Sequence, residues 1–358
     1  FLLTIGLLVG WFLSLQVSKF SSNGPLKTFS VVVPFRNEAQ HLAKLLQTLA
    51  AQSYPSAHYE VICVDDHSSD GSTLIVEEFA SKNANVKLLQ LPPQLIGKKR
   101  ALAHGAAAAQ FEIIATTDAD CQVPYTWLES MAKQFTPNIN LLVGAVKLQP
   151  GKDIFSKLQA MEFSSLIGSG FATLAFGKPT MANGANLAFR KAIFEQVGGY
   201  EGSWHVASGD DEHLMQKLSK QFPHSVHTMT GSESVVTTSP QASLNDFLQQ
   251  RLRWAGKWKF NQSVFSKSLA VFIFLFQVTY LMSLMLFFFN DVDNRQLGLL
   301  LSVKWALEFL FLYAVHLFLR LKWNWFAFFA LQIVYPIYVI TVAITAFFSS
   351  TRWKGREL

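Results

Sequence analysis

The sequence predicts an α/β domain built on a parallel sheet and flanked on both sides by transmembrane α-helices. Strand-like and helix-like segments alternate between residues 29 and 120, a pattern typical of a parallel sheet with crossover helices. Apolar segments with few or no charges lie beyond this block at residues 268–290, 297–319 and 326–348. Each of these is long enough to cross a hydrocarbon core of roughly 30 Å.

Composition excludes two broad classes of protein. Half of the 358 residues are hydrophobic and only 15% are charged, whereas an ordinary soluble domain has about 25% charged residues. The chain is therefore neither intrinsically disordered nor an ordinary soluble globule. The formal net charge is +6, and basic residues beside apolar segments favour anionic lipid or a phosphorylated substrate over nucleic acid. The two cysteines, Cys63 and Cys121, cannot form a disulfide framework.

The segments on either side of the polar block are the basis for the membrane predictions. The chain opens in an apolar run at residues 1–15 with no small-residue cleavage site behind it, so we interpret the run as a truncated membrane helix rather than a signal peptide. Basic residues on both sides of the block predict that it faces the cytoplasm. The basic tail would then lie outside, against the same rule, unless Pro336 breaks the last segment into a re-entrant hairpin. Lys304 and Glu308, four residues apart in the segment before it, are expected to neutralise each other.

Within the polar block the elements follow in a regular order. Strands are expected at 29–34, 59–66, 86–91 and 111–117, and helices at 38–52, 72–84 and 98–110. The first helix repeats leucine with helical spacing, which indicates one buried face. Ligands of parallel sheets bind at the carboxyl ends of the strands. We therefore expect the acidic residues that follow the second and fourth strands to face one crevice.

Asp118 and Asp120 follow the fourth strand. Alternate residues of an extended chain point the same way, which places these two carboxylates roughly 7 Å apart. Such a pair suits a hard divalent cation, or a cation together with a sugar. An ordinary acidic turn is the other interpretation.

Two further segments suit a phosphorylated ligand. Residues 65–72 run from a strand end through an Asp/Ser turn into a helix, which is either a helix cap or a nucleotide pocket where a carboxylate meets a uracil or a ribose. Residues 97–100 open a helix with three cations. These suit a pyrophosphate at the helix N-terminus, or they form a basic surface turn.

Two segments later in the chain also have two interpretations. Asp210 and Asp211 precede a helix; they either cap it or supply a general base. Residues 250–254 combine arginine and tryptophan before the second apolar segment. They form either a membrane-interface helix or a diphosphate clamp with an aromatic platform for a sugar.

In this order the segments resemble the family 2 inverting glycosyltransferases with a GT-A fold. The resemblance is to the membrane-embedded branch that includes cellulose synthase, hyaluronan synthase and ceramide glucosyltransferase. It covers Phe29 to about Lys259, and the matching segments are residues 33–38, 64–72, 97–102, 118–120, 183–190, 209–211 and 250–254. The chain departs from the family pattern in having Gly209-Asp210 where Thr-Glu is usual, which leaves Asp210 a rival base.

The resemblance implies roles for individual residues. Asp66 would contact the nucleobase with Asn37 and Glu38 beside it, and Lys99 would lie near the nucleotide. Asp118 and Asp120 would form the metal and donor motif, with Asp120 the more direct metal ligand. Asp211 would be the catalytic base. The acceptor entrance would be formed by the Gln-x-x-Arg-Trp motif, here Gln250, Arg253 and Trp254.

The function that follows is a membrane-bound, metal-dependent, inverting glycosyltransferase of the hexosyltransferase type. It would move a sugar from a nucleotide-sugar donor, with a UDP-sugar favoured, to a lipid or lipid-linked glycan, using Mg²⁺ or Mn²⁺. A processive polysaccharide synthase is the main alternative, and a nucleotidyltransferase or a non-catalytic membrane scaffold are weaker ones. The enzyme would be an integral protein of a bacterial inner membrane with its catalytic domain in the cytoplasm.

The expected domain organisation has five parts. These are a truncated transmembrane helix at 1–19, a GT-A domain at 20–247, an interfacial helix at 248–267, three membrane segments at 268–350 and a basic tail at 351–358.

Overall fold

The computed structural model describes residues 1–16, 26–204, 209–256, 263–289, 295–348, 352–353 and 356–357. The chain forms two compact units, one made of residues 12–147 and 173–239 and the other of residues 1–11, 148–172 and 240–358. The first unit contains the sheet and the second contains the long apolar helices.

A seven-stranded sheet, in the order β3-β2-β1-β4-β7-β5-β8, is the centre of the first unit. The strands β1, β2, β3 and β4 run parallel, and β7 pairs antiparallel with both β4 and β5. Their bounds are Phe29–Phe35 (β1), Tyr59–Asp65 (β2), Val86–Gln90 (β3), Ile113–Thr116 (β4), Leu141–Val143 (β5), Leu187–Arg190 (β7) and Val226–Thr228 (β8). The expected α/β, Rossmann-like sheet is confirmed.

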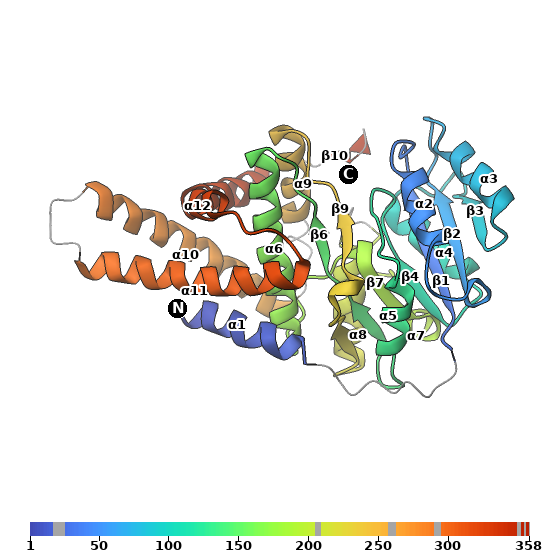
Figure 1. Cartoon of the computed structure of the whole chain (residues 1–358), viewed down its shortest axis with the longest axis horizontal. Coiled ribbons are helices and arrows are strands. Elements are labelled where there is room, and N and C mark those ends of the chain that lie inside the picture. The colour runs from blue at the N-terminus through green and yellow to red at the C-terminus, as the bar shows by residue number, and fades with distance from the viewer. Residues whose placement is uncertain are drawn as a thin grey trace. The chain divides into compact units, whose positions relative to one another are not determined.

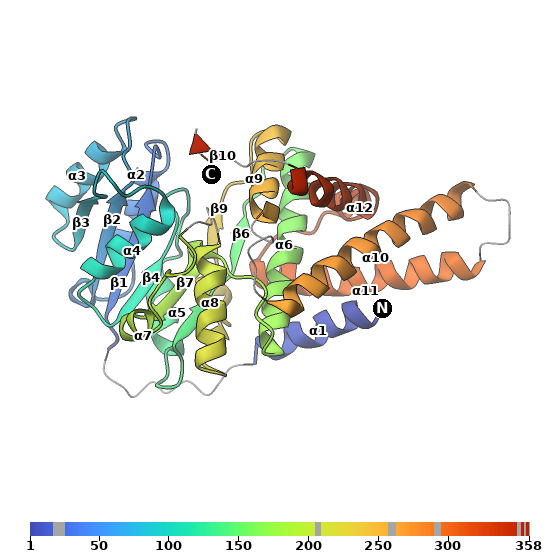
Figure 2. The same cartoon turned by 180° about the vertical axis from the view of Figure 1, so that it is seen from behind.

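Helices cover both faces of this sheet because the first two crossovers travel toward one edge and the third returns across the sheet in the opposite direction. The helices α2 (Leu42–Ala50) and α3 (Ser72–Lys82) connect strands toward one edge and lie together on one face (Figure 1). The return crossover carries α4 (Lys98–Ala108), which packs on the opposite face against β1 and β2 (Figure 2). This follows from the right-handed rule for parallel crossovers. The predicted helix at 38–52 is shorter in the structure, since residues 38–41 form a turn before α2.

The remaining elements of the first unit complete the framework around the sheet. They are α5 (Trp127–Gln134), α7 (Lys191–Gln196) and α8 (Asp210–Gln221), the short helices η1 (Ser56–His58), η2 (Gly184–Asn186) and η3 (Ser232–Ser234), and the pair β6 (Val146–Leu148) and β9 (Val236–Thr238).

Asn186 joins three of these segments through its buried amide. Its Oδ1 accepts a hydrogen bond from Nε1 of Trp127 at 2.9 Å, and its Nδ2 donates to the carbonyls of Ala145 and Ser234, both at 2.8 Å. Asn186 has no solvent exposure. Without this amide, Nε1 of Trp127 and the carbonyl of Ser234 would lose the partner that they have here, whereas the carbonyl of Ala145 would keep the bond from the N of Val236 at 3.1 Å.

We therefore expect Asn186→Ala to lower the free energy of unfolding by about 3 kcal/mol, because each orphaned buried polar group costs about 1–3 kcal/mol. Thermal unfolding of the detergent-solubilised protein measures the loss as a lower melting temperature. The exposed Asn245→Ala is the control and should leave the melting temperature unchanged. Equal melting temperatures for the two variants would contradict the role given to Asn186.

The second unit is helical in its described part. It contains α1 (Leu2–Ser14), α6 (Ile154–Ala175), α9 (Leu244–Gly256), α10 (Val264–Phe289), α11 (Arg295–Leu319) and α12 (Trp325–Phe348), and a short pair β10 (Arg352–Trp353) and β11 (Arg356–Glu357). The last residues of α1 and of α6, 12–14 and 173–175, belong to the first unit. Among the described residues, three helices are long and apolar enough to span a membrane, over Val264–Phe288, Arg295–Leu319 and Trp325–Ala346. Residues 257–262, part of the expected interfacial helix, lie outside the described residues.

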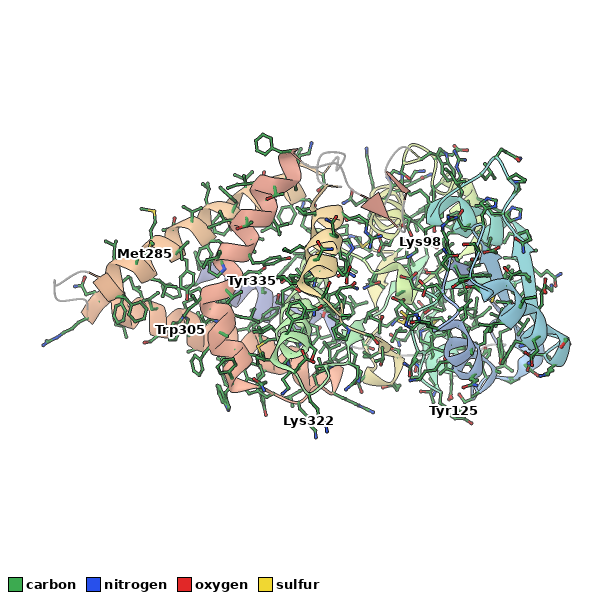
Figure 3. The ribbon with its side chains drawn as sticks, turned by 90° about the horizontal axis from the view of Figure 1, so that it is seen from above. Lys98, Tyr125, Met285, Trp305, Lys322 and Tyr335 are labelled. Carbon is green, nitrogen blue, oxygen red and sulfur yellow. The ribbon has the colours of Figure 1, made fainter. Side chains whose placement is uncertain are left out.

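α12 continues through Pro336 as one helix. The re-entrant hairpin considered from the sequence is therefore not formed. The three apolar helices are joined by a polar cluster, in which Lys304 donates to Glu308 at 2.8 Å, as expected, and to Gln332 at 2.9 Å. Trp305, labelled in Figure 3, donates through Nε1 to the hydroxyl of Tyr280 at 2.8 Å. These bonds satisfy polar groups that would otherwise cost free energy, because the surroundings are apolar.

α6 belongs to the second unit for most of its length, although the sequence boundaries place it inside the 20–247 segment. Met161 packs in one cluster with Ala327 and Phe328 of α12. Gly168 lets α6 approach α11 closely, since a Cβ there would lie 2.6 Å from Val315 and 2.7 Å from Phe311. A helix encoded within the catalytic block is thus part of the apolar helical unit.

Candidate active site

The loops after β1 and β2 are hydrogen-bonded to each other. Asn37 has a positive φ of 52°, a conformation that asparagine tolerates better than most residues. In this conformation its Oδ1 accepts from the backbone N of Ser69 at 2.8 Å, and its own N donates to Oγ of Ser68 at 3.0 Å. The N of Glu38 donates to Oγ of Ser72 at 2.8 Å. Asn37 and Glu38 thus lie beside the turn that follows β2.

Asp66 lies where the end of β2 meets the start of α4. Its side chain is almost fully buried, and its Oδ2 accepts a hydrogen bond from the N of Gly97 at 3.0 Å. Nη1 of Arg36 donates to the carbonyl of Asp66 at 2.7 Å and to that of His67 at 3.0 Å. The carboxylate is therefore held at the N-terminus of α4.

Lys98 connects the acidic residues of this edge. Its Nζ lies 2.5 Å from Oδ1 of Asp118; Lys98 is labelled in Figure 3. Burial alone would lower the pKa of Lys98, but the carboxylates of Asp118, Asp210 and Asp211 outweigh it and raise that pKa above its usual value. The ammonium group is therefore the counter-ion of two acidic segments, one after β4 and one at the start of α8.

Asp120 is exposed to solvent, although enough protein surrounds its carboxylate to make the charged form unfavourable. Burial raises the pKa of Asp120, and the negative charges of Asp118 and Glu38 raise it further. The solvent exposure shows that a ligand can reach this carboxylate. Asp118, Asp120 and Glu38 thus form an acidic surface with excess negative charge.

The two adjacent acids at the start of α8 differ in environment. Asp210 is 7% exposed, and burial raises the pKa of its carboxyl although Lys98 opposes this effect. Asp211 is partly exposed, and its Oδ2 accepts from the N of Gly184 at 2.8 Å. The carbonyl of Gly184 in turn accepts from Oγ1 of Thr116 at 2.6 Å. Asp211 is therefore fixed to the end of β4 while one side stays accessible.

Lys99 points elsewhere, as expected for a neighbour about 100° away on a helix. It is buried, its Nζ donates to the carbonyl of Ser203 at 2.7 Å, and burial lowers its pKa although Asp210 and Asp211 oppose this. The sequence motif indicates Lys99, whereas in the structure it is Lys98 whose ammonium contacts the carboxylate of Asp118. The basic segment Gly97–Arg100 indicates this region, but the choice between the adjacent lysines depends on which side of α4 faces the acidic residues.

The carboxylates of Asp118 and Asp120 could form part of the coordination shell of a divalent cation. Among the described residues no group of three or more His, Cys, Asp or Glu side chains converges on one point. Asp118 and Asp120 nevertheless offer carboxylate oxygens, which Mg²⁺ and Mn²⁺ prefer as ligands. Burial raises the pKa of Asp120, the negative charges of Asp118 and Glu38 raise it further, and a cation beside it would favour its charged form. The other ligands would have to be oxygens of the substrate or water.

Gln250, Arg253 and Trp254 lie together on α9, in the helical unit. The other expected site residues, from Asn37 to Asp211, lie in the sheet-containing unit. The structure thus gathers the expected donor-side residues in one unit and the Gln-x-x-Arg-Trp motif in the other.

Comparison with known proteins finds similarity to glycosyltransferases. Residues 30–198 match the model of "Glycosyl transferase family 2". The glycosyltransferase AglE of Haloferax volcanii is 26% identical over 233 residues, which is 63% of this chain and 70% of that protein. The poly-β-1,6-N-acetyl-D-glucosamine synthase of Staphylococcus epidermidis is 25% identical over 272 residues, 72% of this chain and 62% of that protein.

A third relative is the β-monoglucosyldiacylglycerol synthase of Trichormus variabilis, 31% identical over 183 residues, 49% of this chain and 38% of that protein. Among solved structures, the mannosyltransferase PcManGT of Pyrobaculum calidifontis, in complex with GDP-Man and Mn²⁺, has a TM-score of 0.59 at 18% identity, covering 97% of this chain and 98% of that one. At this identity the structural likeness shows the fold. Except for AglE, the chain spans less than two thirds of the length of these relatives by sequence.

Proposed function

We propose that this chain is an inverting membrane glycosyltransferase. Three observations support this: residues 30–198 match the family 2 glycosyl transferase model, a solved mannosyltransferase has a similar fold, and three of the described helices are able to span a membrane. The proposed enzyme transfers a sugar from a nucleoside diphosphate sugar, with a UDP-sugar favoured, to a lipid or lipid-linked glycan. The observation that carries the proposal is the group of carboxylates from two segments, Asp118 and Asp210–Asp211, around the ammonium of Lys98, which lies 2.5 Å from Asp118.

The donor is bound from the carboxyl ends of β1, β2 and β4. Asp66 recognises the nucleobase, and Asn37 and Glu38 line the same side. Lys98 brings positive charge toward the diphosphate at the start of α4, and Lys99 lies beside it with its Nζ bound to the carbonyl of Ser203. A divalent cation held by Asp120 and Asp118 would stabilise negative charge on the leaving diphosphate.

Asp211 acts as the general base. Its partly exposed carboxylate takes the proton of the acceptor hydroxyl, while the hydrogen bond from Gly184 fixes its direction. The acceptor oxygen bonds to the anomeric carbon as the bond from that carbon to the diphosphate oxygen breaks on the opposite face. The configuration inverts in this one displacement, and no bond to the enzyme is formed.

The acceptor is proposed on the membrane side of the molecule. Three candidate membrane helices and the aromatic Trp254 on α9 suit a substrate held at a membrane surface, and one relative is named a β-monoglucosyldiacylglycerol synthase. A polysaccharide acceptor is the second candidate, since another relative is named a polysaccharide synthase. The catalytic unit is proposed to face the cytoplasm of a bacterial cell.

Donor use is tested by incubating the full-length protein in detergent with UDP-glucose, UDP-galactose, UDP-N-acetylglucosamine and GDP-mannose, Mn²⁺ and a bacterial lipid extract. Release of nucleoside diphosphate is then measured. We expect one UDP-sugar to be consumed fastest. Equal background release from all four donors would contradict a donor-specific site.

Lys98→Met should raise the KM for the nucleotide sugar about tenfold to a hundredfold. A hydrogen bond to a charged group contributes about 1.5–3 kcal/mol, and the variant also leaves the acids without their counter-ion. The matched control is Lys133→Met, which removes an exposed lysine 2.7 Å from Glu129 and should leave KM unchanged. If both variants have the wild-type KM, Lys98 does not face the donor.

A further inference from the structure

A buried ion pair lies beneath the Gln-x-x-Arg-Trp segment. Arg251 of α9 is 3% exposed and Glu162 of α6 is 5% exposed. Nη2 of Arg251 lies 2.5 Å from Oε2 of Glu162, and its Nε lies 3.3 Å from Oε1. This is the two-bond geometry that arginine forms with a carboxylate. Arg251 is therefore not one of the interfacial cations of a membrane-surface helix.

The same guanidinium contacts two residues of the motif. Its Nη1 donates to Oε1 of Gln250 at 2.5 Å. Its central carbon lies 4.4 Å from the ring centroid of Trp254 and 4.6 Å from that of Phe247. Arginine can make both kinds of contact at once because its charge is spread over a planar group. Arg251 thus determines the orientation of Gln250 and Trp254.

α9 is held from two sides through this cluster. On α6, the ring of Phe163 lies 6.1 Å from that of Trp254. On α12, Tyr338 interacts with Arg251, and its ring lies 5.4 Å from that of Phe247. Tyr335 of the same helix is labelled in Figure 3. The motif helix is therefore fixed to α6 and to a candidate membrane helix.

We propose that Arg251 and Glu162 are positioning residues, which hold Gln250 and Trp254 in the orientation that the acceptor side of the reaction requires. The proposal rests on the proposed glycosyltransferase function. A purely structural role is the alternative, because breaking one half of a buried ion pair destabilises a protein whatever its function. The experiment must therefore separate stability from positioning.

Two double variants do so. Arg251→Met with Glu162→Leu replaces the pair by apolar side chains, an exchange that is often neutral or stabilising. Glu162→Arg with Arg251→Glu keeps a pair but puts a carboxylate at 251, which cannot donate to Gln250 or lie over Trp254 as a cation. We expect both to keep a near-wild-type melting temperature. The rate of sugar transfer should fall about a hundredfold, the size of effect that a misplacement of about 1 Å can produce.

The readouts use the donor that the wild-type protein consumes fastest, with lipid extract as the acceptor. We expect the kcat of transfer to fall while the KM for the nucleotide sugar stays within about twofold, because the donor-side residues are untouched. Hydrogen exchange should accelerate over residues 244–256 and stay unchanged over residues 210–221. This second readout does not depend on activity.

Wild-type turnover and wild-type exchange in a stable double variant would overturn the proposal and leave the proposed function intact. A wild-type protein that consumes no nucleotide sugar would refute the proposed function. In that case, faster exchange confined to residues 244–256 in the double variants would still support the role of the ion pair in positioning α9. Unchanged exchange in those variants would overturn that role. Rescue of transfer by the reversed pair would show a structural role only.

Discussion

Asp211→Asn should lower kcat by about 10² to 10⁴, the contribution of a positioned general base. The substitution keeps the size of the side chain and removes its ability to accept a proton. Because Asp211 is partly exposed and fixed by the N of Gly184, its replacement should leave the fold and the affinity for nucleotide sugar little changed. Turnover and donor binding are measured on the same preparation.

The matched control is Asp210→Asn, the adjacent acid that the sequence left as a rival base. Asp210 is 7% exposed, so it lacks the access to an acceptor that Asp211 has, and its variant should be much milder. An inactive Asp210→Asn with an active Asp211→Asn would move the base by one residue. Near-normal turnover in both would place the base on another carboxylate.

Removing the divalent cation should abolish turnover, and adding back Mn²⁺ or Mg²⁺ should restore it. The acidic surface of Asp118, Asp120 and Glu38 has a raised carboxyl pKa at Asp120, and a bound diphosphate would add further negative charge. Without a cation the two would repel each other. Activity is measured in excess chelator, followed by titration with each metal.

Asp120→Asn should reproduce the effect of the chelator, with turnover that no metal concentration restores to the wild-type level. Glu129→Gln is the control, since Glu129 is a surface acid paired with Lys133 at 2.7 Å. Full turnover of the wild-type protein in excess chelator would remove the metal from the proposed function.

Much of the sheet and the carboxylate positions could be predicted from the sequence. Apolar strands that end in Asp65–Asp66 and Asp118 are local patterns, and the rule for the carboxyl ends of parallel strands brings them to one edge. Lys98 could not be separated from Lys99, because the choice depends on the rotation of α4 against the sheet. The sequence does not reveal how long-range contacts fix that rotation.

α6 was missed for a related reason. Its sequence is apolar around Lys157 and Glu162, so it resembles a buried helix of the catalytic domain. The partners that assign it to the helical unit lie about 90 to 170 residues away along the chain: Arg251 on α9, Phe311 and Val315 on α11, and Phe328 on α12. Arg251 was likewise grouped with the interfacial cations, since the sequence does not show that it is buried. Contacts between segments this far apart produce no local periodicity in the sequence.

Transfer of a sugar to a lipid is tested most directly by the mass of the product. The full-length protein in detergent is incubated with the preferred nucleotide sugar, Mn²⁺ and lipid extract, and the lipids are then analysed by mass spectrometry. We expect a lipid heavier by one sugar residue, formed in equal amount to the nucleoside diphosphate released, and NMR of this product should show an inverted anomeric configuration. Release of nucleotide with no lipid of increased mass, or a product with retained configuration, would contradict this expectation.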